Sequence, residues 1–242
     1  MSVFIGYPSF MAYQMMKGKK GDNDGFPSIP GMVARYSGAG LTNEEMSKNP
    51  VWKDLIGNGH DLQMKNFAWK EGSGISDIYP GALVFDGVDD HGVCENFPIL
   101  TKEKGYTVVV LRQWDQDFLN TTLTGGLLST RNYSTGEGVA FEKIESANKG
   151  YWNLGAGGII DFAKSPFTWQ TSKQYNNVGI LKGDKNHGKP LCVGCGLSGG
   201  QQCGRFAIWE LVFLDHDATE EELTKIKDYF VKTYPWLFPD QA

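Results

Sequence analysis

Basic residues, cysteines and long apolar runs are all scarce in this 242-residue chain. No stretch approaches the roughly 20 apolar residues that cross a bilayer, so no membrane insertion is expected. The 23 basic residues are outnumbered by 28 acidic ones, which gives a net charge of −5. Because a phosphate backbone is bound by a surplus of basic residues, nucleic acid is not expected as a partner. Four cysteines are too few for a disulfide scaffold of this size.

The N-terminal residues also lack the features of a secretion signal. Residues 1–8 contain no basic region, no sustained apolar core and no small-residue cleavage site. No signal peptide is therefore expected, and we expect synthesis in the cytoplasm.

Apolar residues are plentiful instead, and they make up 40% of the chain, which is enough for a sizeable core. The 31 glycines argue against a helical bundle. Short β-branched and aromatic runs recur between clusters of Gly, Asn and Asp, which is typical of a β-sandwich. The strongest run, Tyr106–Arg112, is apolar on both faces at its centre and predicts a buried strand. Further strands are expected at 32–36, 126–130, 138–144, 177–182, 190–195 and 205–213.

One helix is predicted near the C-terminus. Thr219 and Glu222 have the spacing of a capping box, and acidic residues fill the first turn, where the helix dipole favours them. Pro235 ends the pattern. An apolar stripe predicts that one face of this helix packs on the sandwich, and it consists of Leu223, Ile226, Phe230 and Tyr234. A shorter helix is expected at 42–46.

Residues 1–30 differ in composition from the remainder and predict an N-terminal arm, followed by a single domain at 31–242. A glycine- and lysine-rich tract at 17–25 separates an apolar stretch from Pro27 and Pro30. The arm is either a frayed terminus or a docking segment that becomes ordered on a partner. Its candidate docking residues are Phe4, Tyr7, Phe10 and Met15.

Four stretches occur in the order found in a known class of domain. Phe206–Asp215, followed by the capped helix, looks like the closing strand and helix of that class. Trp52–Asp61 is similar to its W-x-D-x-x-G-x-G-x-D opening and Phe85–Asp90 to its F-D-G-x-D-D strand-turn. Leu191–Gly194 lies where the class has L-x-I-G. Over residues 32–238 the chain therefore resembles the laminin-G-like, concanavalin A-type jelly rolls.

The resemblance implies an all-β fold, a concanavalin A-like (laminin-G-like) jelly-roll sandwich of two antiparallel sheets. It implies no single activity, because the same fold serves lectins, adhesion modules, viral surface proteins and some glucanases. Ala34–Ser37 ahead of Trp52–Leu55 also resembles virion structural proteins of tailed phages of gut bacteria. That resemblance implies an oligomeric virion component, such as a capsid decoration, head fibre or tail appendage, that contacts other virion proteins.

The sequence lacks the patterns of the common hydrolytic sites. Glucanases on this fold use Glu-x-Asp-x-x-Glu to place two carboxylates across a sugar, and that pattern does not occur. No G-x-S-x-G elbow or Walker loop is present either. The histidines lie in turn-like sequence, where most are solvated. No enzymatic activity is expected.

Metal ligands are sparse, and no cofactor is expected. Cys192-x-x-Cys195 with Cys203 and His187 supplies half of a zinc pattern but no second pair. In the alternative interpretation, Cys192 and Cys203 face each other as core residues or as a disulfide.

Calcium has two weak candidate sites. The oxygen-rich stretch with Asp115, Asp117 and Asn120 faintly resembles a legume-lectin metal loop, but it lacks the leading Glu of that loop. The turn at Asp86–Asp90 is also rich in carboxylates. Both stretches are also explained as turns held by side-chain hydrogen bonds.

Aromatic residues beside Gly- and Asn-rich segments supply the remaining functional signal. Such rings, with neighbouring amides, are used by both sugar-binding and protein-binding sites, although core packing explains many of them. The candidates are Tyr151, Trp152, Asn153 and Trp169. The sequence therefore predicts a non-catalytic structural or interaction protein of a phage virion, with a lectin-like adhesion module that recognises surface glycans as the alternative.

Overall fold

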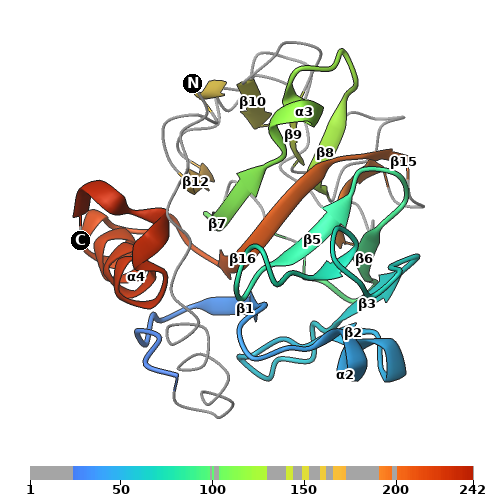
Figure 1. Ribbon diagram of the computed structural model, residues 1–242. Helices are drawn as coiled ribbons and strands as arrows, with labels where there is room; N and C mark the ends of the chain where they lie inside the picture. The colour runs from blue at the N-terminus through green and yellow to red at the C-terminus, as the bar shows by residue number, and fades with distance from the viewer. Residues whose placement is uncertain are drawn as a thin grey trace.

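The computed structural model describes residues 24–98, 100, 104–129, 140–143, 149–152, 159–161, 166–172, 191–197 and 201–241. These residues form a β-sandwich of two antiparallel sheets, with one long helix against the outer face of one sheet (Figure 1). The predicted fold class is thereby confirmed.

The first sheet has six described strands. Their order is β12 (Phe167–Thr171), β7 (Thr107–Trp114), β16 (Arg205–Leu214), β5 (Leu83–Asp86) and β4 (Gly74–Ile75), and β1 (Met32–Ser37) also pairs with β16. The strong β-run predicted at 106–112 is the buried strand β7, and the stretch predicted at 205–213 is β16. These two long strands pair along their whole length and form the centre of the sheet.

The second sheet is built from shorter strands. Its order is β11 (Ile159–Asp161), β10 (Lys149–Trp152), β9 (Ala140–Lys143), β8 (Gly125–Ser129), β13 (Leu191–Val193), β6 (His91–Cys94), β3 (Leu62–Lys65) and β2 (Val51–Trp52). A hairpin of β14 (Cys195–Leu197) and β15 (Gln201–Cys203) joins it through a single parallel pairing between Cys203 and Gly126. The strand predicted at 177–182 lies outside the described residues.

Two apolar clusters lie on the two faces of the six-stranded sheet. Phe206, Ile208 and Phe213 of β16 point into the core between the sheets. Trp209 and Val212 point the other way, into a second cluster beneath the long helix. Because each buried aliphatic or aromatic side chain contributes about 1.5–3 kcal/mol, this sheet is stabilised from both sides.

An extra residue in β16 interrupts this alternation at one point. The register with β7 shifts between Ile208 and Glu210, which marks a β-bulge. Trp209 and Glu210 consequently both face the helix side, and Leu211 returns to the inter-sheet core. The bulge therefore turns a charged side chain away from the core between the sheets.

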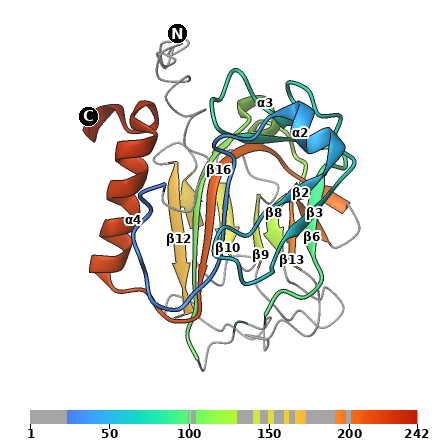
Figure 2. The same ribbon diagram turned by 90° about the horizontal axis from the view of Figure 1, so that it is seen from below.

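The long helix α4 (Glu220–Thr233) begins as predicted. The Thr219 side chain accepts a hydrogen bond from the Glu222 backbone N–H, and the Glu222 side chain accepts one from the Thr219 backbone N–H. Ile226, Tyr229 and Phe230 are buried against the sheet. Figure 2 shows the helix beside β16 and β12, and two 3-10 turns follow it, Pro235–Leu237 and Pro239–Gln241.

Two shorter helices complete the described elements. The helix predicted at 42–46 is α2 (Asn43–Lys48), capped by Thr42. The sequence analysis missed α3 (Gln116–Leu119), which Asp115 caps. Across the described residues, no helix has the length and apolar character to cross a membrane.

Candidate functional site

Three of the four aromatic-site candidates come from one edge of the sandwich. Trp169 lies in β12, which ends the six-stranded sheet. Tyr151 and Trp152 lie in β10, the last strand but one of the other sheet, and Asn153 lies outside the described residues. Figure 1 shows both strands in the upper part of the molecule. We call this end of the two sheets the β10–β12 edge.

Trp169 is 39% exposed and is the one exposed aromatic among the side chains that the structure describes. Its backbone pairs with Val109, whose side chain belongs to the cluster beneath α4, so Trp169 lies on the helix side of its sheet. The Phe167 ring lies 5.3 Å from the Trp169 ring and 5.8 Å from the Phe230 ring of the helix. Phe167 therefore supports the indole from the helix side, and part of the indole remains open to solvent.

The register of β10 gives its two aromatic positions different neighbours. Trp152 pairs with Phe141, a residue of the inter-sheet core, and Tyr151 pairs with Glu142. Because successive residues of a strand alternate between the two faces, positions 151 and 152 lie on opposite faces of this sheet. Position 151 is thus on the face directed away from the inter-sheet core.

The predicted arm is described from residue 24 onward, where it packs on the domain. Asp24 Oδ2 lies 2.6 Å from Arg35 Nη2 and accepts a hydrogen bond from the Tyr229 hydroxyl at 3.2 Å. The Phe26 ring covers the Arg35 guanidinium at 3.9 Å, and Ile29 is buried. These contacts fix the segment 24–30 between β1 and α4. The docking candidates Phe4, Tyr7, Phe10 and Met15 lie outside the described residues.

Beneath this segment lies a buried ion pair. Arg35 Nε donates to Glu210 Oε2 at 3.1 Å, and Tyr234 donates to Glu210 Oε1 at 2.7 Å. Burial raises the pKa of the Glu210 carboxyl, and hydrogen bonds from Arg35 and Tyr234 offset part of that rise. This pair was not predicted from the sequence, although a charged residue inside an apolar strand, such as Arg35 or Glu210, is a signal that a buried partner is present.

The predicted calcium ligands near α3 have other partners. Asp115 Oδ1 accepts a hydrogen bond from the Phe118 backbone at 2.8 Å, and its other oxygen lies 3.6 Å from Arg205 Nε. Asp117 lies in the first turn of the helix and Asn120 caps its end. Helix capping therefore accounts for the residue types at these positions, and calcium binding there stays a prediction.

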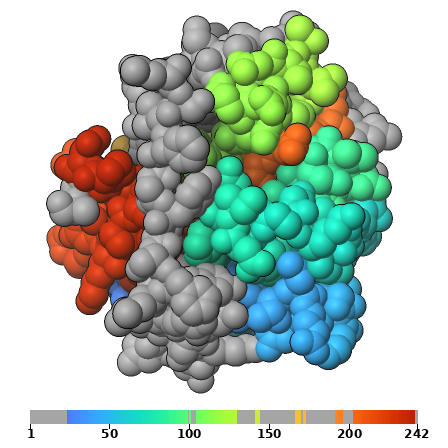
Figure 3. All heavy atoms as spheres, in the orientation of Figure 1, coloured from blue at the N-terminus to red at the C-terminus, as the bar shows by residue number. Residues whose placement is uncertain are grey.

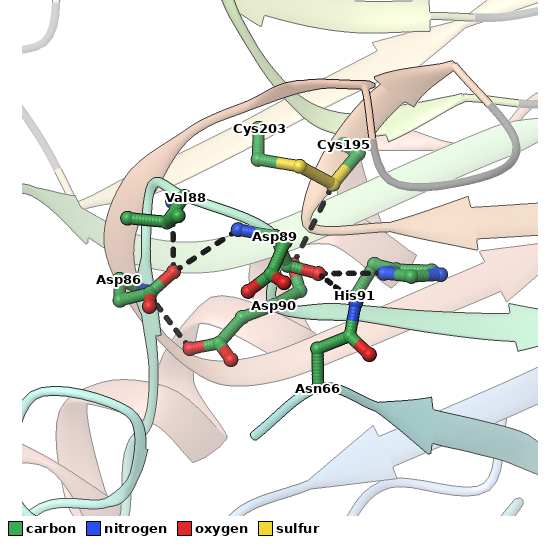
Figure 4. Close-up of a disulfide and its surroundings, with 8 residues drawn as sticks. All are labelled: Asn66, Asp86, Val88, Asp89, Asp90, His91, Cys195 and Cys203. Atoms are coloured by element: carbon green, nitrogen blue, oxygen red, sulfur yellow. Dashed lines mark hydrogen bonds between the residues drawn. A yellow bond between two sulfur atoms is a disulfide. The ribbon is translucent and has the colours of Figure 1, made fainter. Parts of the chain in front are cut away.

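One carboxylate cluster whose oxygens converge occurs within the described part of the chain, at Asp86, Asp89 and Asp90 (Figure 4). Asp86 accepts hydrogen bonds from the backbone N–H groups of Val88 and Asp89, which makes a tight turn. Asp90 is fully buried and accepts hydrogen bonds from the Ser73 hydroxyl and the Asp86 backbone, each at 3.0 Å. Burial raises the pKa of Asp90 to about 7. The cluster therefore shapes the turn between β5 and β6.

One alternative left open by the sequence, a disulfide between Cys192 and Cys203, is wrong. Cys203 forms a disulfide with Cys195, not with Cys192. Cys195 and Cys203 are opposite each other in the β14–β15 hairpin, with their Cα atoms 3.9 Å apart, whereas Cys192 pairs with Val93 and Ser129 in the sheet. The sequence could not distinguish the two pairings because both depend on where the chain turns, and the turn falls at Gly194.

No protein-family model matches the chain, and no curated protein sequence matches it. Solved structures do match its fold. The botulinum neurotoxin serotype D binding domain has a TM-score of 0.55 at 10% identity, and the match covers 83% of this chain and 52% of that one. A Trypanosoma rangeli sialidase in complex with 2,3-difluoro-KDN has a TM-score of 0.51 at 14% identity, covering 89% of this chain and 33% of that one.

These matches establish a β-sandwich fold and nothing finer. The chain spans about half the length of the toxin domain and about a third of the sialidase. A specific resemblance to phage virion proteins or to laminin G domains is not shown.

Proposed function

We propose that this chain is a non-catalytic recognition protein that binds a glycan at the β10–β12 edge. The observation that carries the proposal is Trp169, an indole supported by Phe167 and partly open to solvent on an edge strand. An aromatic face in this position stacks on the apolar C–H face of a sugar ring, and neighbouring polar groups of the loops select its hydroxyls. The structural neighbours lend support, because one is described as a binding domain and the other as a complex with a sugar acid.

A non-catalytic role is favoured by the structural contacts that four of the described carboxylates make. Glu210 is buried against Arg35, Asp115 caps α3, and Asp86 and Asp90 hold a turn. Glycoside hydrolysis needs two carboxyl groups facing a sugar across its scissile bond. Carboxylates engaged in capping and turn formation are not available for that chemistry.

A glycan array probed with the labelled full-length chain identifies the ligand, and calorimetry then measures its affinity. We expect Trp169→Ala to weaken binding about tenfold, which corresponds to the ~1.4 kcal/mol of a stacked ring. Leu55→Ala is the matched control, because Leu55 is 50% exposed and follows β2 at the opposite end of the ten-stranded sheet. Thermal unfolding of both variants establishes that each is folded.

Two results would overturn the proposal. One is an array on which no glycan binds above background. The other is a bound glycan whose affinity is equal for Trp169→Ala and Leu55→Ala. Release of reducing sugar during the incubation would contradict the non-catalytic part.

We further propose, from the sequence resemblance, that the module is displayed on a phage virion as an oligomer. In this arrangement many copies on one particle would raise the avidity for a surface glycan. Light scattering of the full-length chain over a range of concentrations is the test. A defined oligomer is expected, and a monomer at every concentration would exclude assembly of the chain alone.

A further inference from the structure

Three of the four cysteines meet in one buried cluster, and they come from three consecutive strands. Cys192 lies in β13, Cys195 in β14 and Cys203 in β15, and their side chains pack against one another. The disulfide joins Cys195 to Cys203, and Cys192 keeps its thiol. The fourth cysteine, Cys94, lies elsewhere, in the core between the sheets. Three cysteine sulfurs therefore lie close together in the buried interior, away from solvent.

The chain makes a tight turn at Gly194, between Cys192 and Cys195, beside the Cys192 sulfur. Gly194 has a φ of +102°, and a Cβ there would lie 2.5 Å from the Asp90 backbone oxygen. Only glycine fits that position without displacing its neighbours. The turn directs the Cys195 backbone N–H toward the Cys192 sulfur, and this hydrogen bond favours a thiolate. A Cys-x-x-Cys pair with a backbone donor on its first sulfur is suited to ligating a metal ion.

The three cysteine side chains form a buried cluster of their own, so reduction of the disulfide would place three thiols in contact. Thiolate sulfur is a preferred ligand of Zn²⁺, and a bound metal ion deprotonates the thiols that it coordinates. The chemistry open to the reduced cluster is thus ligation of a thiolate-preferring ion.

We propose that reduction of the Cys195–Cys203 disulfide creates a zinc site whose ligands are the sulfurs of Cys192, Cys195 and Cys203. A dithiol reductant supplies two electrons and two protons to the disulfide and is itself oxidised to a disulfide. Binding of Zn²⁺ then releases three protons, one from each thiol. The Asp90 backbone oxygen lies 3.6 Å from the Cys195 sulfur (Figure 4). The predicted fourth ligand His187 lies outside the described residues.

Cadmium is the probe, because its thiolate complexes give a charge-transfer band in the ultraviolet. The full-length chain is reduced under argon, freed of reductant and titrated with Cd²⁺, and Zn²⁺ is then added as competitor. We expect the band to saturate at one ion per chain and to fall when Zn²⁺ is added. The oxidised chain should give no band. Cys192→Ala should abolish the band, and Cys94→Ala, the matched control at a buried cysteine outside the cluster, should leave it intact.

A second readout separates binding from misfolding. Zn²⁺ should raise the thermal midpoint of the reduced wild-type chain and of Cys94→Ala, and leave that of Cys192→Ala unchanged. Circular dichroism before the addition of metal establishes that each chain is folded. The proposal is overturned if the reduced wild type shows no band and no shift, or if Cys192→Ala responds as the wild type does. Neither result bears on glycan binding at the β10–β12 edge.

Discussion

Arg35 and Glu210 are 175 residues apart in the sequence, yet they share a buried site between β1, β16 and α4. Glu210 has no exposed surface, and its oxygens are bound by Arg35 and Tyr234. Removing the negative charge leaves the guanidinium buried with only Asp24 to balance it. We expect Glu210→Gln to lower the free energy of unfolding by about 3–5 kcal/mol, measured by urea denaturation.

The control for this substitution is Tyr229→Phe, which removes a hydroxyl that donates to Asp24 at 3.2 Å and accepts from Arg35 Nη2 at 3.1 Å. It should cost less, about 1.5–3 kcal/mol, because it removes hydrogen bonds to charged groups and leaves the buried ion pair in place. Equal losses for the two variants would show that the buried charge is no more important than this hydroxyl.

Asp90 should make the free energy of unfolding depend on pH. Its pKa is about 7 in the folded chain and about 4 when unfolded, so the folded state binds the proton more tightly. The protonated Asp90 carboxyl contributes fully to the free energy of unfolding below pH ~4, and this contribution is lost as the pH rises to ~7. Relative to Asp90→Asn, the wild type should therefore lose up to a few kcal/mol of unfolding free energy between these pH values. Denaturation curves at several pH values would show the slope, and parallel curves for the two proteins would contradict it.

At the scale of elements, α4 offers a test of local sequence signals. Thr219→Ala removes the cap of the first turn, which should cost about 1 kcal/mol of stability. Thr224→Ala is the matched control on the same helix, because its hydroxyl only donates back to the Glu220 carbonyl and alanine has the higher helix propensity. Urea denaturation should separate the two variants, and equal midpoints would mean that the capping box contributes nothing.

Helices and strands with strong local sequence signals could be predicted, but strands that depend on pairing with a neighbouring strand could not. Tyr106–Arg112 is dense in β-branched residues and α4 carries a capping box, so β7 and α4 were found. β12 was missed although Phe167–Thr171 alternates, because a short strand at a sheet edge gains its structure from β7. Candidate-site residues such as Tyr151 and Trp169 could be named, but the placement of their strands at one end of the two sheets follows from strand order, which no local pattern encodes.

For the whole molecule, the segment 24–30 is held mainly through Arg35 and the aromatic rings of α4, and we expect it to open separately from the sandwich. The Asp24 carboxyl is partly buried, which raises its pKa, but the Arg35 guanidinium outweighs this and holds the pKa below its usual value. The contact therefore contributes stability at neutral pH that is lost as the pH falls below ~4. Combining Asp24→Asn with Phe26→Ala should speed amide exchange in 24–30 and leave β7 and β16 protected. Faster exchange throughout the sandwich would instead show that this segment is part of one cooperative unit.

The space-filling view shows that segments far apart in the sequence adjoin on one face, where residues near 50 lie beside those near 80 (Figure 3). The bulge in β16 governs the faces of the residues that follow it. If the same ten residues paired with β7 without the bulge, Glu210 would point into the core between the sheets, and the side chains from Leu211 to Leu214 would exchange their faces. The bulge therefore lets one strand supply apolar side chains to two clusters and still place its carboxylate opposite Arg35.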